Sequence, residues 1–384
     1  MKYRFCLLLF LSSLGVLSRG QETSAERYNA LDDPEFFPIG VWMQHPRHAD
    51  AYQELGINMY VNLWKGPTVA QLDRLKASGM KVICPQNEVG LSRIDDPDIL
   101  AWNQMDEPDN AQKLKGQKGY GPPVLPEVIQ ERYREIKAAD PSRPVYLNLG
   151  MALAFPGVKN RGVRSNHPED YPEYLKGCDI ASFDIYPASS NKEGVSGNLW
   201  LVPHGVDKLM EWTDGKKPVW TLIECTAISH AEFKPTIPEV KAQVWMAIVH
   251  GVKSITYFVH SFAVSPPHDS ALLTDPEMMA AVKEINAQIQ ALAPVLNSPT
   301  VESKITVSSS NPEVPVDILV KEFEGETYLF AVAMRRKKAR ATFMVKGFEG
   351  EGEVEVLDED RSIPMRNGVF SDTFEPYAVH LYRF

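Results

Sequence analysis

Hydrophobic positions along the chain follow two patterns, and the change between them falls near residue 300. Before that point, short apolar runs alternate with longer segments in which apolar residues recur every three or four positions. Consecutive Val, Ile, Tyr and Trp, rather than strict alternation, are typical of strands that are buried on both faces. The eight expected strands are Phe37–Gln44, Ile57–Trp64, Lys81–Gln86, Ile99–Glu107, Pro144–Gly150, Asp179–Tyr186, Pro218–Cys225 and Ser254–His260.

The segments between these runs have helical spacing and the boundary residues of helices. Val69, Leu72 and Leu75 fall on one face of the segment Thr68–Ser78, for example. Proline stands in the first turn of three segments, and glycine follows the last turn of two, as helix ends favour. The other expected helices are Pro126–Ala139, Gly205–Thr213, Pro238–His250 and Pro276–Leu296.

Eight strand-then-helix units in succession predict an α/β fold, a (β/α)8 TIM barrel over residues 21–299. The alternative is an open, doubly wound sheet. That alternative has little support, because no Gly-x-Gly-x-x-Gly follows the first strand. Long loops follow strands four, five, six and eight, and loops on that side of a barrel build the substrate cleft.

After Leu296 the chain changes to short alternating runs separated by turn residues. No segment of helical period interrupts this stretch, which includes turn sequences such as Arg366-Asn-Gly368. We therefore expect a small antiparallel β-sandwich domain over residues 300–384. Its expected strands are Val316–Val320, Thr327–Ala333, Ala341–Val345, Glu353–Val356 and Ala378–Tyr382.

The first twenty residues predict a secretory signal peptide. Lys2 and Arg4 precede an apolar run from Phe5 to Val16, and small residues stand before Gln21. No later apolar run approaches about 18 residues, the length that a membrane-spanning helix needs. We expect a secreted or periplasmic protein that has no membrane contact once the signal peptide is cleaved.

Charge and cysteine usage narrow the class of protein. The chain has 40 basic and 50 acidic side chains, and removal of residues 1–20 leaves 37 against 50, a balance of 37 − 50 = −13. An acidic, well-mixed chain is unsuited to nucleic acid or anionic lipid. Cys84, Cys178 and Cys225 are an odd, widely spaced set, typical of buried free thiols. We expect no metal and no cofactor, and a monomer by default.

Two glutamates end apolar runs that correspond to the fourth and seventh strands. They are Glu107, in Trp-Asn-Gln-Met-Asp-Glu-Pro, and Glu224, in Val-Trp-Thr-Leu-Ile-Glu. A parallel barrel gathers the carboxyl ends of its strands at one mouth, so these carboxyls are expected to face each other. Facing carboxyls are the equipment for hydrolysis of a glycosidic bond. For Glu224, the alternative is a structural salt bridge with Arg or Lys.

The two glutamates are given different roles. Apolar neighbours and the like charge of Asp106 are expected to keep Glu107 protonated, as an acid/base must be. Glu224 is the expected nucleophile, oriented by a hydrogen bond from Tyr186. Further sugar contacts are expected at strand ends and loops, with loop anchoring or core packing as the alternative for each: Asn148, Gln86, Trp42, Trp64, Trp200 and His260.

The segment Asn103-Gln-Met-Asp-Glu-Pro108 resembles the strand-four region of the clan A glycoside hydrolases. Glu224 after an apolar strand and a Tyr after strand six are similar too. The resemblance implies a retaining β-glycosidase, with Glu224 as nucleophile and Glu107 as acid/base, that acts on a poly- or oligosaccharide. The family has Asn at this position, where it holds the sugar 2-hydroxyl, and this chain has Asp106 instead. Two alternatives stay open, an inverting glycosidase with the same carboxylates and a carbohydrate-binding barrel without turnover.

Overall fold

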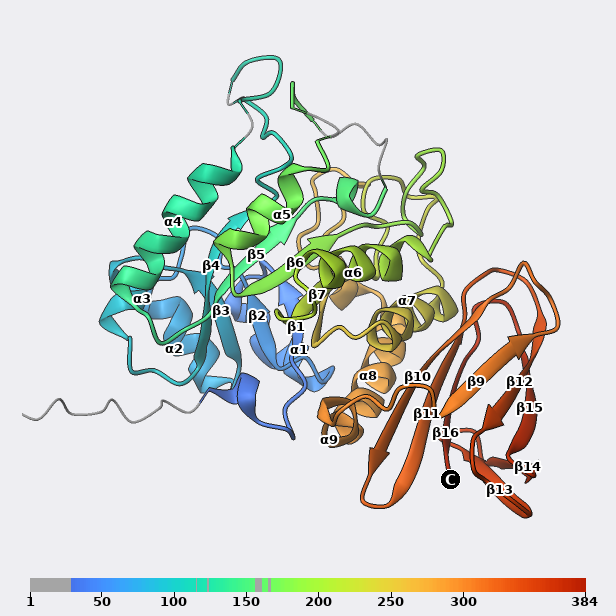
Figure 1. The fold of residues 1–384 in the computed structure, drawn as a ribbon. Coiled ribbons are helices and arrows are strands. Elements are labelled where there is room, and N and C mark those ends of the chain that lie inside the picture. Colours follow the sequence, from blue (N-terminus) through green and yellow to red (C-terminus); the bar gives the residue numbers. More distant parts are fainter. Residues whose placement is uncertain (1–28, 115, 123, 156–160, 165–166) are drawn as a thin grey trace, which may run out of the picture.

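The computed structural model describes residues 29–384 except 115, 123, 156–160 and 165–166 (Figure 1). The expected signal peptide, residues 1–20, lies outside the described residues. The described chain forms two parts side by side, a closed parallel barrel with its helices and a sheet domain that follows it. Both the TIM barrel and the all-antiparallel second domain confirm the predicted fold class.

The barrel closes in chain order, because each strand pairs with the next in parallel and β8 pairs with β1. Its strands are β1 (Ile39–Trp42), β2 (Met59–Val61), β3 (Lys81–Pro85), β4 (Ile99–Asp106), β5 (Val145–Leu149), β6 (Ile180–Asp184), β7 (Val219–Glu224) and β8 (Ser254–Phe258). The α-helices are α1 (Ala49–Glu54), α2 (Val69–Ala77), α3 (Glu88–Ser92), α4 (Pro126–Ala139), α5 (Asp170–Tyr174), α6 (Leu201–Trp212), α7 (Ile237–Val249), α8 (Pro276–Ala291) and α9 (Ala293–Asn297).

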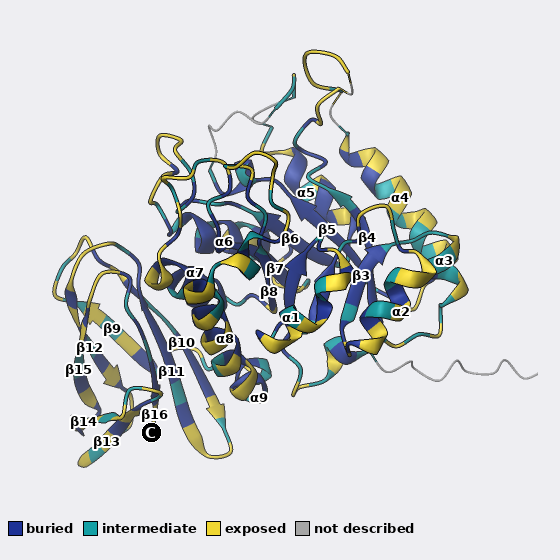
Figure 2. Cartoon of the chain, turned by 180° about the vertical axis from the view of Figure 1, so that it is seen from behind, coloured by how far each residue is buried: buried dark blue, intermediate teal, exposed yellow. Residues whose placement is uncertain are grey.

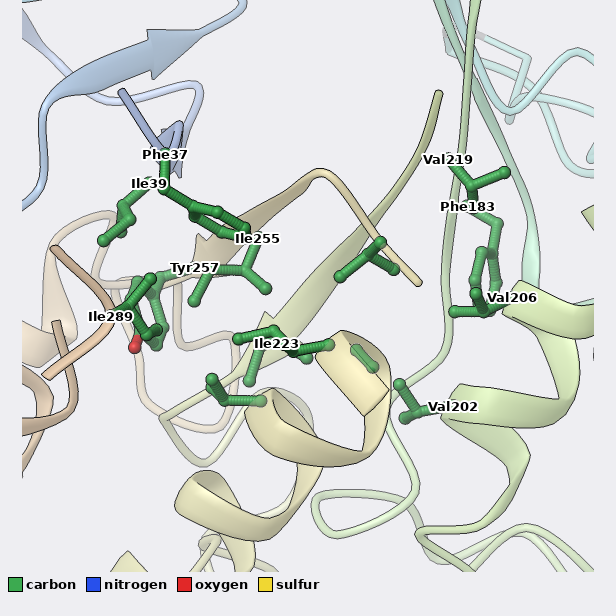
Figure 3. Close-up of a cluster of buried hydrophobic side chains, with 14 of the residues drawn as sticks. Phe37, Ile39, Phe183, Val202, Val206, Val219, Ile223, Ile255, Tyr257 and Ile289 are labelled. Carbon is green, nitrogen blue, oxygen red and sulfur yellow. The ribbon is translucent and has the colours of Figure 1, made fainter. Parts of the chain in front are cut away.

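Side chains alternate between two cores along the barrel strands. On β7, Trp220 and Leu222 belong to a cluster inside the barrel, whereas Val219 and Ile223 pack outward against helices. Figure 3 shows part of the outer core, in which Phe183 of β6 lies against Val206 of α6 with Val219 of β7 beside them. Because both faces of each strand are covered, the barrel strands are dark blue in Figure 2 and lack the alternation of a half-exposed sheet.

Helix boundaries follow the local sequence closely. Thr68 caps α2 through a reciprocal pair of hydrogen bonds with Gln71, a capping box. The expected helix Pro276–Leu296 is wrong in one respect, because it breaks at Leu292 into α8 and α9. Pro294 in the first turn of α9 explains the break, since proline has no N–H to continue the helix before it.

The second domain is one continuous antiparallel sheet in the order β10-β11-β16-β13-β14-β15-β12-β9. The hairpin between β14 and β15 turns at Asn367 and Gly368, both with positive φ, as that Asn-Gly pair predicted. Beyond the five expected strands, the sheet has β9, β14 and β15. Its strands are β9 (Ile305–Ser309), β10 (Val316–Phe323), β11 (Glu326–Ala333), β12 (Ala339–Val345), β13 (Glu351–Val356), β14 (Arg361–Arg366), β15 (Val369–Phe374) and β16 (Val379–Arg383).

The segment just before β9 contacts β10, so that the two edge strands of this sheet come together. Thr300 and Lys321 form an isolated antiparallel bridge just before β9 begins. The N–H of Val301 donates to the carbonyl of Val320 at 3.0 Å. The first and last strands of the sheet order are thus linked, and the sheet is nearly closed.

The two domains meet along helices α7 and α8, which lie between the barrel and the sheet in Figure 1. Trp245 of α7 stacks on Phe330 of β11 with ring centroids 5.5 Å apart. His250, directly after α7, joins Asp207 of α6 to Asp317 of β10, with N···O distances of 2.7 Å and 3.1 Å. Apolar stacking and a histidine that contacts a carboxylate on each side therefore hold the domains together.

Two expectations from composition are tested directly. Cys84, Cys178 and Cys225 are buried free thiols, as expected. Within the part of the chain that the structure describes, no helix is long and apolar enough to cross a membrane.

Candidate functional site

A cavity of about 770 Å³ opens where the carboxyl ends of the barrel strands meet. Its wall includes strand-end residues such as Asp106 and Asp184 and parts of the loops that follow β4, β5, β6, β7 and β8. The expected contributions of the loops after β4, β5, β6 and β8 are confirmed, and residues 228–230 after β7 are an addition.

A larger hollow of about 1410 Å³ lies at the opposite end of the barrel. Its wall includes Pro38, Pro144 and Pro218, each of which directly precedes a strand. Barrel enzymes place their chemistry at the carboxyl ends of the strands, and residues at the other end serve stability. We therefore assign the site to the smaller cavity.

Glu107 stands at a sharp change of direction at the end of β4. The pairing of β4 with β5 is irregular between Asn103 and Asp106, and Glu107 itself has a φ of 43°, in the left-handed region. Its N–H donates to the carbonyl of Asn148 on β5 at 2.9 Å. An irregularity of this kind re-aims a side chain, and here it brings Glu107 to the cavity wall.

Two polar side chains bind the Glu107 carboxylate. Asn110 donates to its Oε2 at 2.9 Å, and Arg161 approaches the same oxygen at 3.2 Å. Arg161 also donates to the Asn110 side chain, so the three groups form a small network at the rim of the cavity. The Glu107 side chain is 18% exposed and the Arg161 side chain 37%, which leaves this pair open to solvent.

Asn148, at the end of β5, bridges two further carboxylates. Its Nδ2 donates to Asp106 of β4 at 3.1 Å and to Asp184 of β6 at 3.3 Å. Its Oδ1 accepts from Ser182, which in turn accepts from the Tyr146 hydroxyl. Both amide hydrogens of Asn148 are thus used inside the protein, and the ends of β4, β5 and β6 are locked together.

Burial, together with this concentration of acids, raises the pKa of each carboxyl. Burial raises the pKa of Asp106 to about 6 and that of Asp184 to about 7, partly offset by the hydrogen bonds from Asn148. Burial also raises the pKa of Glu107 well above its usual value, and the negative charges of Asp184, Asp106 and Asp109 add to the effect. Protonated carboxyls are therefore available in this cavity near neutral pH.

Glu224 has different surroundings. It is fully buried at the end of β7, where its two oxygens accept hydrogen bonds from the backbone N–H of Ala188 at 2.6 Å and of Ser189 at 2.7 Å. Burial raises the pKa of Glu224 to about 7 in spite of these bonds. Leu222 and Ser189 are among the described residues that line the cavity, and Glu224 is not.

Tyr186 lines the cavity, but the expected hydrogen bond from Tyr186 to Glu224 is wrong. Its hydroxyl lies beside Asp184 instead. Burial, and then the negative charge of Asp184, raise the pKa of Tyr186. Among the described residues, that enclosed hydroxyl has no hydrogen-bond partner of good geometry. The backbone of the loop after β6, rather than its tyrosine, binds Glu224 because the chain turns back over the end of β7.

The remaining expected sugar contacts divide into those at the cavity and those away from it. Trp42, Asp106 and Asn148 line the cavity. Gln86 instead donates its side-chain amide to the carbonyl of Ile136, at the outer side of the barrel. The anchoring alternative therefore describes Gln86 better than sugar contact does.

Three expected aromatic contacts also lie apart from the cavity wall. Trp64 is 68% exposed at the end of the β2 region and has Lys65 over its ring. Trp200 belongs to the domain interface, because the guanidinium carbon of Arg335 in the sheet domain lies 5.2 Å from the centroid of its ring. His260 lies behind the wall, with its Nε2 3.1 Å from the carbonyl of Trp42 and its ring against Phe262.

Several residues of the cavity were not expected from the sequence. Arg161 lies in an irregular loop and has no local pattern to mark it, although it binds Glu107. Phe258, the last residue of β8, also lines the wall. Asp184 is different, because it lies two residues before Tyr186 and alternate residues of a strand share a face, so its place beside Tyr186 followed from the sequence.

Comparison with known proteins is informative at the level of structure. No protein-family model and no curated protein sequence matches the chain. Among solved structures, an α-amylase from Geobacillus thermoleovorans complexed with acarbose superposes with a TM-score of 0.56 at 13% identity, over 91% of this chain and 98% of that one.

Two further solved structures are similar over the same extent. An α-L-arabinofuranosidase from Thermotoga maritima, in an arabinose complex, has a TM-score of 0.55 at 11% identity, over 91% of this chain and 96% of that one. An endoxylanase from Clostridium papyrosolvens has a TM-score of 0.50 at 12% identity, with the same coverage. At these identities the likeness shows a shared fold, of the barrel together with the domain that follows it.

Proposed function

We propose that this protein is a secreted glycoside hydrolase that cleaves β-glycosidic bonds of a poly- or oligosaccharide with retention of configuration. The observation that carries the proposal is Glu107, a carboxyl with a raised pKa on the wall of a cavity at the barrel mouth. The fold shared with an amylase, an arabinofuranosidase and a xylanase supports it. Fold alone does not establish activity, so the residues must carry the argument.

In the proposed reaction, Glu107 gives its proton to the glycosidic oxygen as the bond from that oxygen to the anomeric carbon breaks. Glu224 attacks the anomeric carbon, and a covalent glycosyl-enzyme forms. Water then displaces Glu224 and passes a proton to Glu107, which restores both groups. The leaving sugar takes one proton and the released sugar takes the hydroxyl of water.

The position of Glu224 sets a condition on this mechanism. Its carboxylate is engaged by the N–H groups of Ala188 and Ser189, and Ser189 forms part of the cavity wall beside it. Glu224 is fully buried and does not line the cavity, so attack on a bound sugar requires a movement that brings one of its oxygens to the cavity. Two donors to a carboxylate also favour its ionised form, which a nucleophile needs.

The test combines a glycan panel with a variant of Glu224. We expect the wild type to release reducing ends from one or more β-linked glycans, and Glu224→Ala to abolish turnover. Added azide is expected to yield a glycosyl azide with the variant, because the cavity left by the side chain admits a small nucleophile. Glu211→Ala, an exposed site on α6, is the control and should leave activity unchanged.

Full activity of Glu224→Ala would refute the assignment of the nucleophile. The enclosure of Glu224 also favours a second candidate, a barrel that binds carbohydrate without turnover. Glycan binding by the wild type, together with no product from any glycan of the panel, would establish that candidate instead.

A further inference from the structure

Three cavity-lining carboxyls, Asp106, Glu107 and Asp184, come from two strand ends on either side of β5. Glu107 and Asp106 end β4, and Asp184 ends β6. Asn148, between them on β5, holds Asp106 and Asp184 with its side chain and Glu107 with its backbone carbonyl. One residue therefore fixes the relative positions of all three acids.

Asp184 has little to neutralise it. Its oxygen Oδ1 accepts from Asn148, a neutral amide, and the Tyr186 hydroxyl lies beside it. Among the described residues, no ion pair to Asp184 or Asp106 is formed at 4.0 Å or less, whereas Glu107 has Arg161 at 3.2 Å. Since Arg161 binds Glu107 rather than Asp184, the charge of Asp184 acts on Glu107 with little compensation from the described residues.

We propose that Asp184 is a positioning residue for Glu107: fixed by Asn148, its negative charge keeps the proton on Glu107 that the leaving oxygen requires. This inference rests on the proposed function, and it names a group with which Glu107 shares its proton. Asp184 acts through Glu107, and the inference gives it no bond to the sugar.

The charges that face Glu107 come from four places. They are Asp106 on β4, Asp109 in the loop after β4, Asp184 at the end of β6 with Tyr186 just after it, and Arg161 in the loop after β5. After burial, Asp184 is the largest single contribution to the raised pKa of Glu107, followed by Asp106 and then Asp109, while Arg161 opposes them. Two such coupled acids titrate as a pair, so that near neutral pH one proton is shared between them.

The order of these charges gives a graded test. In Asp184→Asn the alkaline limb of the kcat/KM profile is expected to move to lower pH by about one unit, because Glu107 loses its proton more readily without a like charge beside it. Asp106→Asn is expected to move the same limb less. Asp184→Glu, which restores the charge, is expected to return the limb towards the wild-type position.

A fall in kcat with no movement of the alkaline limb in Asp184→Asn would overturn the proposal and leave Asp184 a purely structural residue. Circular dichroism spectra and thermal unfolding curves of the three variants verify that each is folded. Asp207→Asn, at the domain interface, is the control for loss of a carboxylate far from the cavity, and it should leave the limb in place.

A second measurement needs no turnover and separates this inference from the proposed function. The 13C carboxyl signal of Glu107, assigned by its loss in Glu107→Gln, is followed through a pH titration in wild type and Asp184→Asn. A lower midpoint in the variant supports the inference even if no glycan is cleaved. Equal midpoints would refute it even in an active enzyme.

Discussion

The ends of β4 and β7 carry the same sequence feature, a glutamate after an apolar run, and the folded protein treats them in opposite ways. Glu107 has left-handed backbone geometry, lines the cavity and lies among other carboxyls. Glu224 ends a regular strand, is fully buried and is bound by two backbone N–H groups. Negative charges gather around Glu107, whereas backbone N–H dipoles surround the carboxylate of Glu224.

This contrast supports the proposed division of roles between the two carboxyls. Burial raises the pKa of both groups. At Glu107, neighbouring negative charges raise it further, which suits an acid, whereas at Glu224 backbone donors oppose the rise, which suits an anion. The proposed division of roles therefore follows from what surrounds each glutamate rather than from its position on the strand.

The largest expected effect comes from removal of the acid. Glu107→Gln should lower kcat/KM about 10²–10⁴-fold for a glycoside with a poor leaving group, because no proton reaches the departing oxygen. A dinitrophenyl glycoside, whose leaving group needs no proton, should lose much less. Initial rates on both substrates measure the difference.

If Glu107→Gln lost kcat/KM equally on the two substrates, Glu107 would not be the acid, and the proposed difference in role between Glu107 and Glu224 would be refuted. Glu224→Ala provides the matched comparison, since a missing nucleophile should impair both substrates alike. Glu211→Gln on α6 serves as the exposed control and should impair neither.

A smaller effect is expected on stability at the other strand end. The pKa of Glu224 is raised to about 7 in the folded state, so the folded protein binds more protons than the unfolded chain between pH 4.5 and 7. Stability should fall as pH rises through that window, by up to about 3 kcal/mol for this one group. In Glu224→Gln the side chain at this position does not ionise, so the variant lacks this pH-dependent loss of stability.

The free energy of unfolding of Glu224→Gln relative to wild type should therefore increase from pH 5 to pH 8 in urea titrations. The pH dependence, rather than the absolute value, isolates the effect, because the glutamine amide also disturbs one backbone donor. A difference that stays constant with pH would show that Glu224 does not titrate in this range.

The smallest expected effect concerns a buried base, for which the sign is reversed. Burial lowers the pKa of His250, but its bonds to Asp207 and Asp317 outweigh this and raise it to about 9. The stability that it contributes is fully present below pH 6.5 and is lost as pH rises through about 9. His250→Ala should cost about 2 kcal/mol at pH 6, since both carboxylate partners are partly exposed.

The same variant should cost clearly less at pH 10, where the wild-type histidine is neutral. Unfolding by urea at the two pH values measures this change. His167→Ala, which removes a surface pair with Glu169, is the control for loss of an exposed histidine. An equal cost of His250→Ala at both values would show that packing rather than charge holds the domains at this point.

The architecture of the barrel could be predicted from the sequence because its strands are buried on both faces. Each of the eight expected runs contains the observed strand, with one to five residues too many in total at its two ends. In the second domain β9, β14 and β15 were missed. Each of these strands has only one or two buried residues, and β14 includes Pro364, which argues locally against a strand.

The site could be predicted only as far as strand ends determine it. Glu107, Asp106 and Asn148 were found because they end β4 and β5, and their convergence follows from the closed barrel. Arg161 was missed because its approach to Glu107 depends on the path of a long loop. The backbone donors to Glu224 were invisible for a similar reason, since any residue type can offer an N–H.

The sheet of the second domain has a consequence for how this protein behaves at high concentration. An unpaired strand at the rim of a sheet is a template on which other chains aggregate. The bridge between Thr300 and Lys321 and the bond from Val301 to Val320 place both rims of this sheet against each other. At this point of each rim, backbone groups that could otherwise pair with another chain are used within the domain.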